Sequence, residues 1–148
     1  MNSENMNNTS DISYFRLSLM DFLKESHPEL LKDKRFLIAC TDAATEAYER
    51  AIRNGDTPDE AAEQANIVLF RGLHFSKHDT LVNILWNEFS NEVPEETAND
   101  LAIQLLPECE QVFAQYPLSD GFAYKPQYDL LYTELTGTIA LFIETHNS

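Results

Sequence analysis

The sequence predicts an all-α fold, a single-domain irregular bundle of six or seven helices with no sheet. Three observations support this prediction. The chain has 148 residues, enough for one sizeable core, and only 4 glycines and 6 prolines, too few for the repeated tight turns of a sandwich or barrel. Ala, Leu and Glu, which favour helices, are plentiful. Apolar residues also recur at three- and four-residue steps, the period of an amphipathic helix.

The first half of the chain predicts a tail and two long helices. Residues 1–10 are rich in Asn and Ser and lack the apolar residues that offset the entropy of ordering, so we expect a disordered tail before a helical domain over 11–148. The first helix should end at His27, because Pro28 disfavours helical backbone in the residue before it. The second should end at Gly55. Its small-residue face predicts close approach of a neighbouring helix, and its apolar stripe is Phe36, Cys40, Ala43, Ala44, Ala47 and Ala51.

The clearest helix start in the chain is Thr57-Pro58-Asp59-Glu60, which combines an N-cap hydroxyl, proline at the first helical position and glutamate at the third. That helix should end at Gly72. Further helices are predicted through Leu81 to Phe89, after Pro94, and over residues 128–145.

Two features interrupt the predicted helices of the second half. Pro107 lacks an amide proton and obstructs the preceding turn, so we expect a kink or a new helix start there. Residues 117–127, PLSDGFAYKPQ, form the longest loop, which Phe122 and Tyr124 should pin to the body. Gly137 in the last helix should cost about 1 kcal/mol relative to Ala, unless another backbone packs against it.

One stretch raises the question of metal chemistry. Residues 73–81, LHFSKHDTL, place His74 and His78 four positions apart, a spacing typical of metal ligands on one helix. Gly72 and a cap from Ser76 to Asp79, however, predict a helix boundary between the two histidines. A metal would then need a further ligand from elsewhere. The alternative function is therefore a small metal-dependent hydrolase that uses His74, His78 and Asp79.

Other enzymatic motifs are missing from the sequence. It contains no glycine-rich phosphate loop and no Glu-x-x-His pairs of the kind that hold di-iron centres, so no cofactor is predicted. Cys40 and Cys109 lie in predicted helices at no metal-like spacing, which favours buried free thiols over a disulfide. Glu108 and Glu110 should raise the pKa of the Cys109 thiol and disfavour its use as a nucleophile. The sequence thus favours a non-enzymatic role.

The charge of the chain limits its partners. The sequence has 10 Lys and Arg against 25 Asp and Glu, a formal net charge of −15. Residues 78–148 contain Lys125 as their single Lys or Arg against 12 acids, a net charge of −11. Nucleic acid and anionic lipid are bound through cations, so we expect no direct nucleic acid and no membrane partner. No apolar run approaches the roughly 20 residues that span a bilayer, and the N-terminus has no signal-peptide pattern, which predicts a cytoplasmic protein.

The positive prediction is a protein-interaction module whose partner has a basic surface. Trp86, Tyr124, Tyr128 and Tyr132 lie in the acidic half, and aromatic residues with acids around them suit such an interface. Trp86 also shares a helical stripe with Val82 and Phe89, which favours a core position instead. A homodimer is compatible with the prediction. A narrower hypothesis is that the acidic half mimics nucleic acid, and the plain alternative is that its acids only form a solvated face.

Four stretches of the sequence resemble a known family, the bacterial domain of unknown function numbered eighteen ninety-six. They are LKESHPEL at 23–30, LHFSKHDTLVNILWNEF at 73–89, LPECEQVFAQYPLSDGFAY at 106–124 and YDLLYTELTGTIALF at 128–142. The resemblance implies a helical, cytosolic, single-domain protein of the Bacteroidetes, of a kind often encoded near mobile or conjugative elements. It implies no catalytic or binding residue.

Overall fold

The computed structural model describes residues 3–146, with side chains from Ser13 to His146. Within that range the chain forms seven α-helices and no strand, which confirms the all-α prediction. None of these helices is both long enough and apolar enough to cross a membrane. The α-helices are α1 (Ser3–Ser26), α2 (Lys34–Arg53), α3 (Pro58–Leu69), α4 (Lys77–Glu88), α5 (Ala98–Glu108), α6 (Glu110–Phe113) and α7 (Gln127–His146), and the short 3-10 helices are η1 (Pro28–Leu30), η2 (Glu95–Thr97) and η3 (Phe122–Tyr124).

α1 includes residues 3–10, for which the sequence predicts a disordered tail. Residues 1 and 2 lie outside the described residues, and disorder of the tail in solution stays a prediction. The contacts of the chain fall into two compact units, Met1–Arg71 and Gly72–Ser148, and each is described by itself below. The predicted extent of one domain over residues 11–148 likewise stays a prediction.

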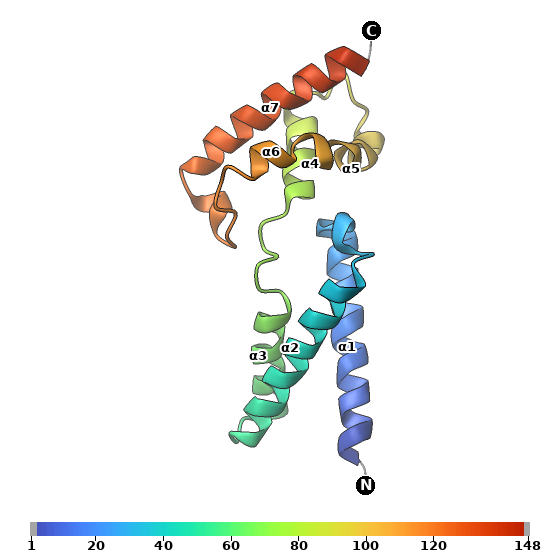
Figure 1. The fold of residues 1–148 in the computed structure, drawn as a ribbon, viewed down its shortest axis with the longest axis vertical. Helices are drawn as coiled ribbons and strands as arrows, with labels where there is room; N and C mark the ends of the chain where they lie inside the picture. Colours follow the sequence, from blue (N-terminus) through green and yellow to red (C-terminus); the bar gives the residue numbers. More distant parts are fainter. Residues whose placement is uncertain (1–2, 147–148) are drawn as a thin grey trace. The chain divides into compact units, whose positions relative to one another are not determined.

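The first unit consists of α1, α2 and α3 (Figure 1), and its most extensive helix–helix contact is between α2 and α3. Each of the two helices buries two alanines, Ala44 and Ala51 in α2 and Ala61 and Ala65 in α3, whereas Ala43 of the predicted stripe is exposed. Side chains of this size let two backbones approach closely, as the small-residue face of the second helix predicts. The larger buried apolar side chains of this unit come from α1 and from the ends of α2 and α3, namely Phe15, Leu19, Leu23, Leu37 and Leu69.

The turn between α2 and α3 follows the predicted capping signals. Gly55 adopts a left-handed φ of 97°, which a residue with a Cβ rarely takes, and the chain then enters α3 at Thr57. The Thr57 hydroxyl accepts a hydrogen bond from the Glu60 amide at 3.2 Å, and the Glu60 carboxylate accepts one from the Thr57 amide at 2.8 Å. This reciprocal pair is the predicted capping box.

The second unit packs α4, α5, α6 and α7 around one core, with α7 in contact with both α4 and α6 (Figure 1). Leucine and isoleucine dominate that core, and truncation of one such side chain to Ala typically costs about 2–5 kcal/mol. Phe122 is fully buried and makes edge-on contacts with Phe75 at 5.4 Å and Tyr116 at 5.9 Å between ring centroids. The fully buried aliphatic side chains are Leu81, Ile84, Leu85, Leu105, Leu131, Leu135 and Ile139.

Pro107 lies inside α5, close to its end. The Cys109 amide still donates to the Leu105 carbonyl at 2.9 Å, so the helix passes the proline before α6 begins at Glu110. The new helix start that Pro107 predicts is therefore present, but it comes after the proline rather than at it. Pro107 removes the amide that would donate to the Ile103 carbonyl, and because it lies in the last turn of α5, few further helical hydrogen bonds follow it.

Candidate functional site

The stretch LHFSKHDTL forms a corner rather than one helix. Gly72 has a left-handed φ of 81°, and α4 begins only at Lys77. The Ser76 hydroxyl accepts a hydrogen bond from the Asp79 amide at 2.9 Å, the predicted N-cap interaction. The two histidines therefore lie on opposite sides of a helix start.

The corner is held by a residue that sequence reasoning missed. The Asp120 carboxylate accepts hydrogen bonds from the Gly72 amide at 3.0 Å and from the His74 amide at 3.1 Å. It thereby joins segments 46 and 48 residues apart along the chain. The Ser-Asp-Gly turn indicates a loop, but the sequence does not show which distant amides its carboxylate reaches.

His78 is buried and has neighbours within the protein at both ring nitrogens. Nδ1 lies 3.4 Å from an Asp79 carboxylate oxygen, and Nε2 lies 3.3 Å from the backbone carbonyl oxygen of Asn99 in α5. His74 is exposed, in the corner before α4. The described residues contain no group of three or more His, Cys, Asp and Glu side chains that could hold a metal. No observation in residues 3–146 thus favours the metal-dependent alternative, in which His74, His78 and Asp79 would act together.

The two cysteines are free thiols. Burial raises the pKa of Cys109 to about 11, and the negative charge of Glu108 contributes to the rise. The direction agrees with the sequence prediction, although burial rather than the neighbouring charge is the larger cause. Burial also raises the pKa of Cys40. Both shifts disfavour the thiolate, the form a nucleophile requires.

The four predicted interface aromatics separate into two kinds. Tyr128 and Tyr132 are partly buried at the edge of the core, with ring centroids 6.2 Å apart. The Tyr132 hydroxyl donates to the Glu88 carboxylate at 2.9 Å and lies 3.3 Å from the Asn87 amide nitrogen, which donates to it. Burial raises the pKa of both tyrosines. Tyr132 thus ties α7 to α4, whereas the Tyr128 ring lies 6.4 Å from the rings of both Phe75 and Phe122.

Trp86 and Tyr124 are exposed instead. Trp86 is 45% exposed, although Val82 and Phe89 of the same stripe are buried. The prediction that Trp86 lies in the core is therefore wrong. The reason is that the buried face of α4 is centred on Leu81 and Leu85, which places Trp86 on its flank. Tyr124 is 94% exposed, and the expectation that it pins the long loop is also wrong. Phe122 alone of that pair enters the core.

A depression of about 320 Å³ lies beside Trp86 and is also lined by Ser90, Val93 and Glu95. It forms where α4 ends and the chain turns toward η2. The Val93 amide donates to the Phe89 carbonyl at 2.8 Å, which closes this turn. The residues around the depression are thus one aromatic, one hydroxyl-bearing, one apolar and one acidic residue.

The surroundings of this depression are strongly anionic. The unit from Gly72 contains two basic residues, Lys77 and Lys125, against 12 acids, a net charge of −10. Lys77 already pairs with Glu110 at 3.6 Å. The segment that forms the depression and its flanks carry four exposed acids, Glu88, Glu92, Glu95 and Glu96.

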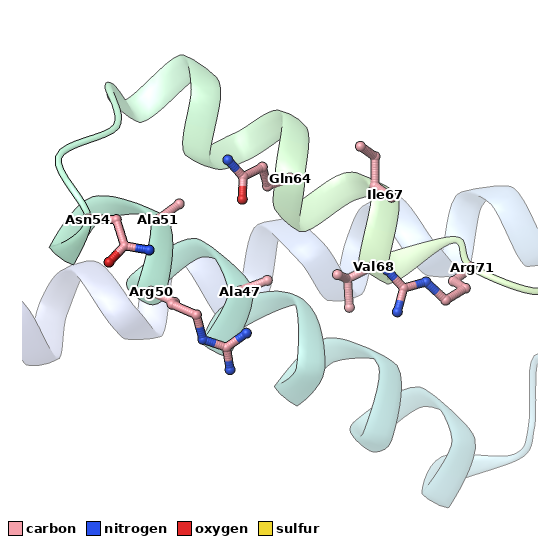
Figure 2. A pocket seen from close by; sticks show the side chains of 8 residues that line it. All are labelled: Ala47, Arg50, Ala51, Asn54, Gln64, Ile67, Val68 and Arg71. Atoms are coloured by element: carbon pink, nitrogen blue, oxygen red, sulfur yellow. The ribbon is translucent and has the colours of Figure 1, made fainter.

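Figure 2 shows a second depression, in the first unit, of about 260 Å³ between α2 and α3. Two of its four polar side chains, Arg50 and Gln64, are engaged by the chain itself. Arg50 pairs with Glu46 at 2.6 Å, and the Gln64 amide donates to the Asp56 carboxylate at 2.8 Å. This depression therefore offers less binding chemistry than its composition suggests. Its lining residues are Ala47, Arg50, Ala51, Asn54, Gln64, Ile67, Val68 and Arg71.

The helical fold and the chemistry of its surface define a class, an acidic all-α protein without a recognisable catalytic centre in the described residues. The chain belongs to the family described as a domain of unknown function, DUF1896, whose sequence profile matches residues 7–148. This confirms the resemblance found in the sequence. The chain is also similar to protein PG0816 from Porphyromonas gingivalis, known from a crystal structure. The two are 43% identical with a TM-score of 0.90, over 95% of this chain and 96% of that one.

No curated protein matches the chain at a significant level. The comparisons therefore establish the family and the fold and supply no activity. Cytoplasmic location, an association with mobile elements and a homodimer stay predictions.

Proposed function

We propose that the protein is a non-enzymatic interaction module that binds a basic segment of a protein partner at Trp86. The carrying observation is the 45% exposure of its single tryptophan beside a preformed depression of about 320 Å³. Tryptophan is among the residues that most often dominate binding energy in protein interfaces. An exposed indole next to a concave surface is therefore the best starting point for an interface on this unit.

The negative charge of the unit favours a positively charged partner. The unit carries a net charge of −10, and Glu95 lines the depression itself. An Arg or Lys side chain of a partner could lie over the indole face and pair with this carboxylate at the same time. The surrounding acids would speed encounter with a basic segment at low salt and repel an acidic one.

The proposal can be tested with a model peptide. A fluorescein-labelled dodecapeptide of alternating Arg and Gly is titrated with the protein at low salt, and its anisotropy is measured. Binding should shift the emission of Trp86, the only tryptophan, and should weaken as salt is raised. The Trp86→Ala variant should bind about tenfold more weakly or worse, the loss typical of a central interface tryptophan.

Leu141→Ala is the matched control, because Leu141 is a large apolar residue that is 67% exposed on α7 of the same unit. It should leave peptide affinity within about twofold of the wild type, well below the hot-spot threshold. Equal losses in the two variants would refute a role for Trp86. Equal binding of the corresponding Glu–Gly peptide would refute the requirement for a basic partner.

A further inference from the structure

A third concave surface lies in the first unit and differs in chemistry from the Trp86 depression. It has a volume of about 640 Å³ and lies between α1 and the segment that runs from η1 into α2. Four apolar side chains line it: Met20 from α1, Leu31 from the turn, and Leu37 and Ile38 from α2. Leu37 is buried, whereas Ile38 is 49% exposed despite its size. This volume is in the range of small-molecule sites, which are mostly apolar with a few polar groups.

The turn that shapes this groove is fixed by the chain. The His27 amide donates to the Leu23 carbonyl at 2.8 Å, and the Leu30 amide donates to the His27 carbonyl at 2.9 Å. The Asp33 amide then donates to the Leu30 carbonyl at 3.1 Å just before α2 begins. His27 itself is buried and packs near Phe22, with ring centroids 5.9 Å apart. The groove is therefore preformed.

Three cationic side chains line the same groove, Arg16 from α1, Lys32 from the turn and Lys34 from α2. They are three of only 10 Lys and Arg in a chain with a net charge of −15. None of them forms an ion pair with a described carboxylate. Asp33, between the two lysines, is engaged as the N-cap of α2, where it accepts from the Phe36 amide at 3.1 Å. The Asp33 carboxylate keeps its negative charge, but the three cations outnumber it, so the groove is positively charged toward a ligand.

We propose that this groove binds a monomeric long-chain carboxylate. The apolar side chains would remove the alkyl chain from water, and the cations would hold the carboxylate through charge-assisted hydrogen bonds. A neutral hydrocarbon would gain nothing from the three cations, and a small hydrophilic anion would gain nothing from the apolar side chains. The groove thus offers both interactions that an amphipathic anion needs, apolar contacts for its alkyl chain and positive charge for its carboxylate.

The total charge of the chain favours a small ligand over a large acidic surface. At physiological ionic strength, exposed charges are screened beyond about 8 Å, so one carboxylate senses mainly the nearby groups, which are the three cations and the Asp33 carboxylate. An anionic bilayer or an acidic protein would extend over the surrounding acids as well, and it would be repelled by them. This inference is independent of the interaction proposed for Trp86, because the two surfaces belong to different units.

The test uses ligands that share a tail and differ in the head group. The full-length protein is titrated calorimetrically with dodecanoate and with dodecyltrimethylammonium, both below their critical micelle concentrations, and with acetate. We expect saturable binding of dodecanoate, at least about tenfold weaker binding of the cationic ligand, and no detectable binding of acetate. Equal affinity for the two dodecyl compounds would overturn the proposal, because the cations would then play no role.

Variants localise the site. The double variant Lys32→Glu/Lys34→Glu should weaken dodecanoate binding about tenfold or more, since it replaces attraction with repulsion. Arg53→Glu is the matched control, because Arg53 is an exposed cation at the far end of α2 and does not line the groove. Equal losses in the two variants would overturn the site. Circular dichroism verifies folding, and the head-group comparison on the wild-type protein stands even where a variant fails to fold.

An experiment with lipid vesicles distinguishes a free long-chain carboxylate from an anionic membrane surface as the ligand. Protein that sediments with phosphatidylcholine vesicles containing phosphatidylglycerol, but does not bind monomeric dodecanoate, would overturn the proposal in favour of a membrane surface. Binding of monomeric dodecanoate without sedimentation would support it.

Discussion

The Asp120 carboxylate holds the corner between Gly72 and α4, and its removal should destabilise the protein measurably. Asp120→Ala deletes the hydrogen bonds to the Gly72 amide at 3.0 Å and to the His74 amide at 3.1 Å. A hydrogen bond to a charged group contributes about 1.5–3 kcal/mol, but Gly72 and His74 are exposed, so water can replace the lost acceptor in part. We therefore expect a loss of about 2 kcal/mol in the free energy of unfolding, or about 4–8 °C in Tm.

Urea denaturation followed by circular dichroism measures this loss. Ser119→Ala is the control, because Ser119 neighbours Asp120 in the same exposed loop and its hydrogen bonds run through its backbone. It should change stability by less than about 0.5 kcal/mol, as expected for a surface substitution. Amide hydrogen exchange at Gly72 and His74 should also accelerate in Asp120→Ala and not in Ser119→Ala. Unchanged stability and exchange in Asp120→Ala would refute the clamp.

Three further predictions concern single side chains. The Thr41 hydroxyl is buried without a hydrogen-bond partner among the described residues, so Thr41→Val should raise stability by about 1 kcal/mol in urea denaturation, and a loss would contradict this. An added Cβ at Gly137 meets nothing within 4 Å, so Gly137→Ala should raise Tm through a gain of about 0.5–1 kcal/mol, and a fall in Tm would reveal a contact there. At pH 8 a thiol-reactive dye should label half-buried Cys40 in the folded protein and should label Cys109, with its pKa of about 11, only after unfolding. Equal labelling rates before unfolding would show that Cys109 is accessible.

Local features of the fold were predictable wherever the interacting groups are close in the sequence. The caps at Thr57 and Ser76 depend on hydrogen bonds between residues three apart, and both are present as predicted. The helix boundary within LHFSKHDTL follows from the second of these caps. It separates His74 from His78, which is why their four-residue spacing does not by itself create a metal site.

Exposure was less predictable, and the candidate site depends on it. The stripe of Val82, Trp86 and Phe89 is apolar throughout, yet the packing of α4 buries two of its members and leaves Trp86 45% exposed. A helical stripe wider than the contact surface must leave one edge in solvent, and the sequence does not show which edge. Tyr124 and Phe122 differ in the same way, since both are aromatic residues of one loop and only Phe122 is buried.

The sequence by itself determined the helical class, most helix ends, the family and the strong negative charge of the second half, because these follow from composition and from interactions between near neighbours. Only the tertiary structure decided which side chains meet across long separations. It brought Asp120 to the amides of Gly72 and His74, left Trp86 beside a depression, and placed Arg16 of α1 in one groove with Lys32 and Lys34. The physical reason is that packing acts on whole helix faces, whereas the sequence states only which residues each face contains.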